Sequence, residues 1–260
     1  MFGTIHIISL FITIIIITAG TILSLKLPLE KCIKILLFIG ILSEAVKIFT
    51  YILMNEDTLG GYLPKTDLPF QLCSIQILFI IILYLSKNEN LKRIIRSFML
   101  PTCLVGGLAA ILIPTSSSVG TLNILTFQYF GYHAVIMIFA LRMLIGKDVQ
   151  FTIRDYATSL VLLFAMMFFA VYINSMLYNG SSDGSFIYQV TDGEHVGEIQ
   201  LTNVNFMYVA NPPQSGLPFL NENHGWGVYF VHYTFTCLFA ITSVYLPTII
   251  KSITPRKRSN

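Results

Sequence analysis

Two reactive side chains stand inside apolar stretches of this sequence. Cys73 lies in LPFQLCSIQ, and His133 lies in FQYFGYHAVI. A cysteine beside a histidine can become a thiolate nucleophile and carry an acyl group as a thioester, with the imidazole acting as base and then as acid. A buried cysteine can also serve only as a small hydrophobe, and a membrane histidine only as a packing hydrogen bonder. The residue types therefore allow two interpretations, a reactive Cys–His pair or two packing residues.

Other polar residues interrupt the same apolar stretches and are candidates for supporting or substrate-binding roles. They are Glu44, Lys47, Gln71, Gln76, Gln128 and His232. Ionisable side chains are costly inside a membrane and mark functional sites by default. Glu44 and Lys47 are three residues apart, so on a helix they share one face and could form an ion pair.

The amino-acid composition predicts which secondary-structure elements position these residues. The 260 residues are 55% hydrophobic and 11% charged, whereas soluble domains are about 25% charged. An ordinary soluble enzyme is therefore excluded. With about 20 apolar residues needed per membrane helix, we predict an all-α polytopic membrane protein, one domain over residues 1–260. Its seven transmembrane helices are expected near 4–25, 32–54, 68–86, 94–113, 124–145, 156–178 and 225–250.

The basic residues predict the orientation. Every Lys and Arg except Lys47 and Lys65 falls in the first, third and fifth gaps between helices, at the adjoining helix ends, or at the C-terminus. Cytoplasmic loops collect Lys and Arg. The acids of the even gaps are Glu56, Asp57, Asp67, Asp183, Asp192, Glu194, Glu198 and Glu222. We therefore predict a multi-pass protein of the cell membrane, with the N-terminus outside and the C-terminus cytoplasmic.

One long extracytoplasmic loop, residues 179–224, is expected before the last helix. Two β-favouring runs flank TDGE, which predicts a β-hairpin turning at Asp192 and Gly193. The rest of the loop is rich in Asn, Pro and aromatic residues, which favours a structured lid over the bundle.

Depth in the membrane brings the polar residues together. At 1.5 Å per residue from the outer helix ends, Lys47 lies about 11 Å deep, Cys73 about 8 Å, His133 about 14 Å and His232 about 9 Å. Four helices therefore place polar groups in the outer half of the bilayer. This predicts a shared polar cavity that opens outward beneath the loop.

Other chemistries receive less support. The basic residues lie in short gaps between apolar runs, so nucleic acid is not an expected partner. No CxxC or paired-histidine spacing supports a metal site, and no cofactor motif is present. The four cysteines all lie in or beside apolar runs, which predicts free thiols.

The order of the motifs resembles a known family. DLPFQLCSIQ, FQYFGYHAVI and NFMYVANPPQSGLPFL followed by GWGVYF resemble the YwaF-like bacterial integral membrane proteins, which are related to eukaryotic transmembrane protein 164, a phospholipid acyltransferase. The resemblance implies a seven-helix fold and a membrane cysteine that carries an acyl group, with a histidine as its base. The family cysteine falls on Cys73, the histidine on His133, and the Asn of an NYM-like motif on Asn205, for which the resemblance implies a role as oxyanion donor or lid anchor. Gln71 stands where the family pattern has a second histidine.

These observations together predict a lipid acyltransferase or hydrolase that works at the outer leaflet through Cys73 and His133. Its partner would be a membrane phospholipid or lysolipid. Two alternatives remain open. The same cavity could serve a non-enzymatic ligand-binding or transport protein, or it could belong to an accessory subunit.

Overall fold

The structure is a computed structural model. It describes residues 3–54, 63, 65–114, 122–149, 151–178, 185–191, 196–202, 204–210 and 225–253. Several predicted features lie outside these ranges, namely the turn at Asp192 and Gly193, most of the acids of the even gaps, and the basic C-terminal residues from Arg256 to Arg258.

Seven α-helices are found in the described part of the chain, which confirms the predicted helical architecture. They are α1 (Thr4–Leu25), α2 (Leu29–Met54), α4 (Leu72–Leu85), α5 (Glu89–Leu112), α6 (Ile124–Ile145), α7 (Ile153–Met176) and α8 (Trp226–Ile253). Five of them, α1, α5, α6, α7 and α8, are long and apolar enough to cross a membrane. The chain is therefore a membrane protein with several apolar helices.

The structure corrects the limits of the third predicted span. The sequence predicted a helix over 68–86 that begins at Asp67 and Pro69, but α4 has 14 residues and begins at Leu72. At 1.5 Å per residue it is about 21 Å long, less than the hydrocarbon thickness of about 30 Å. The preceding residues form the short 3-10 helix η1 (Lys65–Asp67), followed by a turn in which the Phe70 N–H donates to the Leu68 carbonyl at 2.8 Å.

Two other helices begin earlier than predicted because capping side chains precede them. The Asn88 side chain accepts from the N–H groups of Asn90 and Leu91, so α5 starts at Glu89 and not near 94. Thr152 and Asp155 form a reciprocal capping box, so α7 starts at Ile153 and not near 156. Such caps satisfy amide groups that the helix itself leaves without acceptors.

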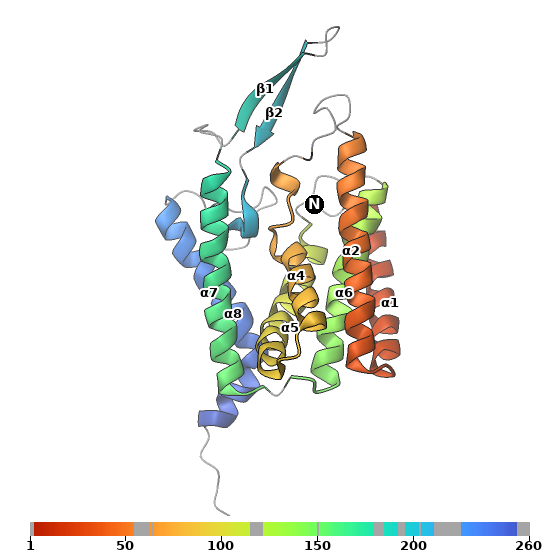
Figure 1. The fold of residues 1–260 in the computed structure, drawn as a ribbon, viewed down its shortest axis with the longest axis vertical. Helices are drawn as coiled ribbons and strands as arrows, with labels where there is room; N and C mark the ends of the chain where they lie inside the picture. Colours follow the sequence, from red (N-terminus) through yellow and green to blue (C-terminus); the bar gives the residue numbers. More distant parts are fainter. Residues whose placement is uncertain are drawn as a thin grey trace, which may run out of the picture.

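Helices α5 and α6 form the centre of the bundle. Helix α6 packs on α1, α2 and α5, while α5 also packs on α4, α7 and α8. Figure 1 shows α1, α2 and α6 on one side, α7 and α8 on the other, and α4 with α5 between them. Gly107 permits a close approach of α5 to α6, because a Cβ there would lie 2.7 Å from Met137 Cγ and 3.6 Å from the His133 carbonyl oxygen.

Helix α1 buries polar or small residues and exposes large apolar ones, as a helix that faces lipid does. Its buried residues are polar or small, namely His6, Thr13, Thr21 and Ser24. Its exposed face carries large apolar side chains, including Phe11 at 67% exposure and Ile15 at 66%. A helix face made of exposed large apolar side chains indicates contact with a membrane or with another protein, and the length of the helices favours the membrane.

Between α7 and α8, the described chain contains two strands and a short 3-10 helix. Strand β1 (Ser185–Thr191) pairs antiparallel with β2 (Val196–Thr202), with Ser185 opposite Thr202. Both strands extend beyond the end of the bundle at which α7 ends (Figure 1). The 3-10 helix η3 (Phe206–Tyr208) follows and returns to the bundle.

Candidate functional site

The structure brings Cys73 and His133 into contact. Cys73 lies in the first turn of α4, and His133 lies near the middle of α6. The His133 Nε2 atom is 3.2 Å from the Cys73 Sγ atom. His133 is only 6% exposed, whereas Cys73 is half-buried. A buried base therefore faces the thiol of a half-buried cysteine.

The other ring nitrogen of His133 determines which tautomer is present. Nδ1 lies 2.7 Å from the Tyr129 carbonyl oxygen. A carbonyl oxygen can only accept a hydrogen bond, so Nδ1 must carry the proton. Nε2 is then left with its lone pair directed at Cys73, and the thiol donates to it. This is the arrangement that a general base for thiol deprotonation needs.

The first turn of α4 supplies backbone donors next to the thiol. The Ile75 N–H donates to the Gln71 carbonyl at 2.9 Å, so the N–H groups of Leu72, Cys73 and Ser74 precede the first intrahelical bond and have no acceptor within the helix. Figure 1 shows that α4 begins well inside the bundle, away from the end where α2 and α7 terminate. The positive end of the α4 dipole therefore lies at Cys73 within the bundle.

Tyr132 fixes the position of this helix start. Its hydroxyl donates to the Cys73 carbonyl oxygen at 2.8 Å, and its side chain is 5% exposed. Tyr132 directly precedes His133, so the same turn of α6 contacts both the backbone and the thiol of Cys73. Tyr132 is not among the site residues predicted from the sequence. Its signal was a tyrosine in mid-span, because a buried phenol in an apolar helix usually has a hydrogen-bond partner.

Gln71 joins the start of α4 to the segment 205–209, which we call the strap. Its Oε1 atom accepts from the Met207 N–H at 2.9 Å, and its Nε2 atom donates to the Asn205 carbonyl at 3.3 Å. Met207 and Tyr208 both have left-handed backbones, with φ of 56° and 54°. Such conformations cost energy for non-glycine residues and persist only where surrounding contacts hold them.

Contacts from α7 and α8 supply that restraint. Asn174 donates to the Phe206 carbonyl at 3.3 Å and accepts from its N–H at 2.9 Å. The Tyr229 hydroxyl donates to the Tyr208 carbonyl at 2.6 Å, and the Tyr233 hydroxyl to the Met207 carbonyl at 2.5 Å. The strap is therefore a fixed part of the bundle, attached two residues before Cys73.

Asn205 also contributes to the strap. Its Oδ1 atom accepts from the Ala210 N–H at 3.1 Å, while its backbone oxygen accepts from Gln71. These contacts hold the strap together and attach it to the start of α4. Of the two roles that the resemblance implied for Asn205, the lid anchor agrees better with this geometry than the oxyanion donor.

A second group of polar residues lies between α2 and α6, toward the end where α2 terminates. The Gln128 Nε2 atom donates to the Ser43 hydroxyl at 2.8 Å. The Lys47 Nζ atom lies 2.6 Å from Glu44 Oε1, and both side chains are 16% exposed. A Cβ on Gly40 would lie 3.8 Å from the Tyr132 ring, which sets this part of α2 beside the Cys–His pair.

Gln76 is placed one turn after Cys73 on α4. It is 1% exposed, and its Nε2 atom donates to the Thr102 hydroxyl of α5 at 3.2 Å. Its Oε1 atom is buried and has no hydrogen-bond partner among the described residues. This contact ties α4 to α5 directly beneath the thiol.

His232 lies away from the pair. Its side chain is on the exposed face of α8, and its backbone carbonyl accepts from the Thr236 hydroxyl at 2.9 Å. The predicted depth of His232 is similar to that of Cys73, but depth sets only the level of a residue in the membrane and not the face of the helix on which it lies.

The four cysteines are free thiols, as predicted. Among the described residues, no three His, Cys, Asp or Glu side chains converge as a metal site.

Comparison with known families agrees with the motifs. A family model described as the TMEM164 family matches residues 1–245. No curated protein and no solved structure matches the chain. The family match includes the Cys–His pair, the strap and most of α8, and it confirms the relation to transmembrane protein 164 that the motifs predicted. Because the matched residues span nearly the whole sequence, the chain belongs to the TMEM164 family.

Proposed function

We propose that this protein is a membrane-embedded lipid acyltransferase or hydrolase that acts through an acyl-thioester on Cys73. The observation that carries the proposal is the 3.2 Å contact between Cys73 Sγ and His133 Nε2, with Nδ1 of the same ring 2.7 Å from the Tyr129 carbonyl oxygen. Membership of the TMEM164 family supports it, because the motif resemblance implies a relation to a phospholipid acyltransferase.

The chemistry begins with proton transfer from the Cys73 thiol to His133 Nε2. The thiolate attacks the ester carbonyl carbon of a phospholipid, and a carbon–sulfur bond forms as the carbonyl oxygen becomes an oxyanion. The first-turn N–H groups of α4 are suitable donors to that oxyanion, because they lack intrahelical acceptors and lie in a low-dielectric environment. The amide of Gln128, a predicted supporting residue, already donates to Ser43.

Collapse of this intermediate breaks the carbon–oxygen ester bond. The imidazolium of His133 returns its proton to the leaving oxygen of the lysolipid. The acyl group then remains on Cys73 as a thioester. A lysolipid hydroxyl or water attacks it, with His133 again taking the proton, and the free thiol is restored.

Substrate binding is proposed to use the polar residues of α2. Lys47 stands seven residues beyond Gly40, about 10 Å along the helix, and Gly40 is level with Tyr132. A cation in that position suits the phosphate of a phospholipid whose ester carbonyl reaches Cys73. Glu44 holds the Lys47 side chain through their ion pair.

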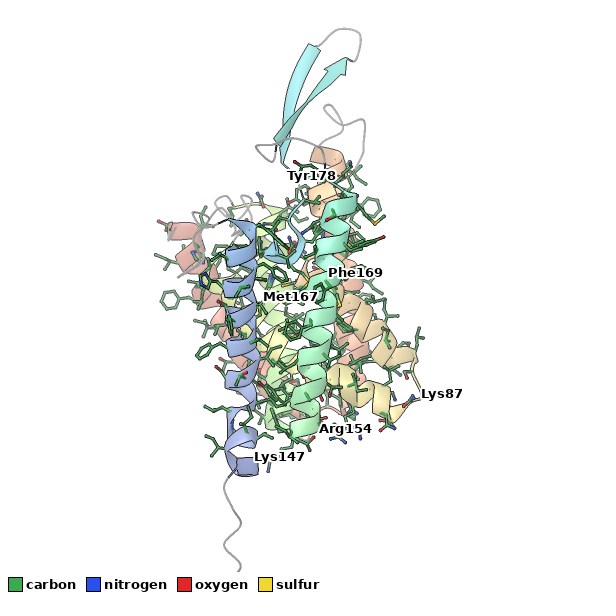
Figure 2. All side chains as sticks on the ribbon, turned by 90° about the vertical axis from the view of Figure 1, so that its left-hand side faces the viewer. Lys87, Lys147, Arg154, Met167, Phe169 and Tyr178 are labelled. Atoms are coloured by element: carbon green, nitrogen blue, oxygen red, sulfur yellow. The ribbon has the colours of Figure 1, made fainter. Side chains whose placement is uncertain are left out.

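We propose the outer leaflet of the cell membrane as the place of reaction. Figure 2 shows Lys87, Lys147 and Arg154 near one end of the bundle and Tyr178 at the other. The positive-inside rule assigns the basic end to the cytoplasm. Cys73 begins the helix whose other end adjoins Lys87, so the thiol would belong to the outer half.

Turnover in proteoliposomes tests this proposal. The protein is reconstituted with a phospholipid that carries an isotope-labelled acyl chain, and a lysophospholipid is added from outside. We expect labelled acyl chains to appear in the acceptor, or as free fatty acid if water is the acceptor. Mass spectrometry of the extracted lipids distinguishes these products. Retention of lipid without any labelled product would favour the non-enzymatic binding reading and contradict the proposal.

A further inference from the structure

A charged cavity lies at the opposite end of the bundle from the Cys–His pair. Its volume is about 310 Å³, and its lining includes Glu89, Arg93, Arg96, Ser97, Lys147 and Asp148. These residues come from the start of α5 and from the connection between α6 and α7. Neither Cys73 nor His133 contributes to it, so the cavity has no part in the function proposed above.

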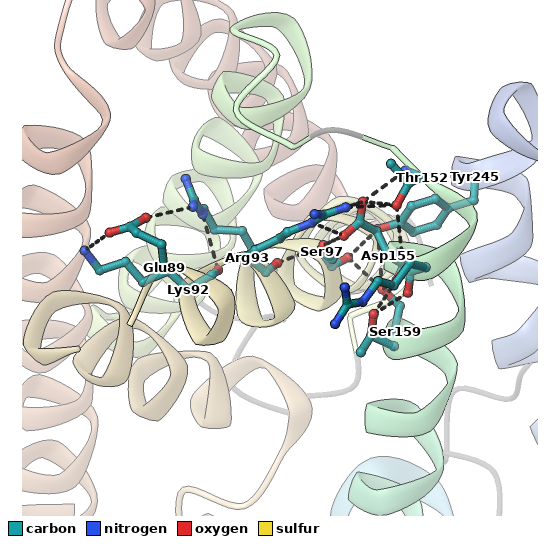
Figure 3. Close-up of polar contacts among 11 residues, drawn as sticks. Glu89, Lys92, Arg93, Ser97, Thr152, Asp155, Ser159 and Tyr245 are labelled. Atoms are coloured by element: carbon teal, nitrogen blue, oxygen red, sulfur yellow. Dashed lines mark hydrogen bonds and ion pairs between the residues drawn. The ribbon is translucent and has the colours of Figure 1, made fainter. Parts of the chain in front are cut away.

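The acidic groups of the cavity are already paired with cations. Glu89 Oε1 accepts from Lys92 Nζ at 2.8 Å, and the Asp148 carboxylate is paired with Arg142. Glu89 also forms a longer ion pair with Arg96 at 3.6 Å, and Figure 3 shows Glu89 beside Lys92. The carboxylates therefore leave little negative charge to repel an incoming anion.

One of the cavity cations is also fully engaged. Arg93 Nε lies 2.7 Å from Asp155 Oδ1, and Arg93 Nη2 lies 3.0 Å from Asp155 Oδ2. Figure 3 shows this paired arginine reaching away along α5 toward Thr152 and Tyr245. Arg93 thus lines the cavity, but its charge is already balanced by Asp155.

The two other cations of the cavity, Arg96 and Lys147, are less tightly paired than Arg93. Arg96 uses Nε to donate to the Lys92 carbonyl at 3.2 Å, and its Nη2 atom is 3.6 Å from Glu89, beyond hydrogen-bond distance. Lys147 is exposed and forms no ion pair with the described residues. Its backbone φ of 58° holds it in a left-handed turn beside Asp148. Including Lys92, Arg142 and Asp155, the region has five cationic and three anionic groups.

We propose that this cavity binds a phosphate group, with Arg96 and Lys147 as its cationic contacts. A guanidinium presents a fork of N–H donors that matches phosphate oxygens, and an ammonium adds a point charge. Basic pockets at the cytoplasmic ends of membrane helices suit anionic lipid headgroups. The same chemistry would accept a soluble phosphate ester, so the ligand class is a phosphate carried either by a lipid or by a small molecule.

Binding can be measured on the whole protein in nanodiscs of neutral phosphatidylcholine. In one arm, phosphatidylglycerol is introduced at increasing fraction. In the other, inorganic phosphate is added to the buffer. A ligand that binds the folded protein raises its thermal midpoint, and the dependence on concentration gives the affinity. Stabilisation by phosphatidylglycerol alone identifies a headgroup site, and stabilisation by inorganic phosphate identifies a site open to soluble phosphates. Either result supports the proposal.

Arg96→Gln with Lys147→Gln is the diagnostic double variant. Each basic group near a membrane surface contributes about fivefold to the binding of an anion, so the double variant is expected to bind roughly thirtyfold more weakly. Arg154→Gln is the matched control, because Arg154 is an exposed cation at the same end that does not line the cavity. Thermal midpoints in neutral nanodiscs establish that the variants fold. The proposal is overturned if neither ligand stabilises the wild type, or if both variants lose affinity equally.

Discussion

Cys73→Ala is expected to abolish both acyl transfer and labelling of the protein by a lipid-like thiol electrophile. The Cys73 thiol is the nucleophile that forms the proposed thioester, so turnover should fall by at least about a thousandfold. The side chain is half-buried, and its removal deletes one sulfur atom and its contact with His133. The thermal midpoint should therefore change little, and the loss can be read as loss of chemistry.

His133→Gln should lower the rate by about a hundredfold to ten-thousandfold, the usual contribution of a general base. Glutamine retains hydrogen-bonding capacity but cannot take the thiol proton. Cys237→Ala is the matched control, since Cys237 is also a partly exposed free thiol, but it lies on α8, outside the Cys–His contact. Labelling that persists unchanged in both Cys73→Ala and His133→Gln would exclude the proposed pair.

The largest expected effect on stability concerns Asp155 and not the candidate site. Its carboxylate accepts from Arg93, from the Thr152 hydroxyl at 2.7 Å and from Ser97 at 3.2 Å. Asp155 itself is 3% exposed in its side chain. Figure 3 shows the cluster continuing to Ser159 and Tyr245, so that it joins α5, α7 and α8.

Asp155→Ala should lower the free energy of unfolding by about 3 kcal/mol, because it breaks a buried ion pair and removes half of a capping box. The value is at the low end of the range for buried pairs, since Arg93 is 34% exposed and can be partly solvated. Denaturant titration in detergent micelles measures the change.

Glu89→Ala is the control for that experiment. Glu89 also pairs with cations, Lys92 and Arg96, but its side chain is 72% exposed. Exposed ion pairs add little stability, so no measurable loss is expected. Equal destabilisation by the two substitutions would show that the buried position of Asp155 is not what gives its pair its strength.

Much of the fold could be predicted from the sequence, because runs of about 20 apolar residues have few other solutions. The expected limits 4–25 and 124–145 agree with α1 and α6 to the residue. The limits of α4 were wrong, because hydropathy continues through Leu68 and Phe70 while the backbone there turns. As a result, the sequence did not indicate that Cys73 lies in the first turn of a helix.

The Cys–His pair was accessible to sequence reasoning, but its supporting contacts were not. Depth placed Cys73 and His133 in one layer, and both residues face the interface of α4 with α6. The same reasoning placed His232 in that layer, yet its side chain faces outward. Which face of a helix turns inward depends on packing between helices that are distant in sequence. The contacts of Gln71 with the strap, more than 130 residues away, could not be predicted for that reason.

The central claim is that Cys73 carries the acyl group between donor and acceptor. The most direct test is mass spectrometry of the peptide containing Cys73 after the protein has been incubated with an isotope-labelled phospholipid and quenched in acid. We predict a labelled acyl group on Cys73 that hydroxylamine removes, as it cleaves a thioester. Acyl transfer that proceeds at the wild-type rate in Cys73→Ala, with no acyl group found on this cysteine, would contradict the account.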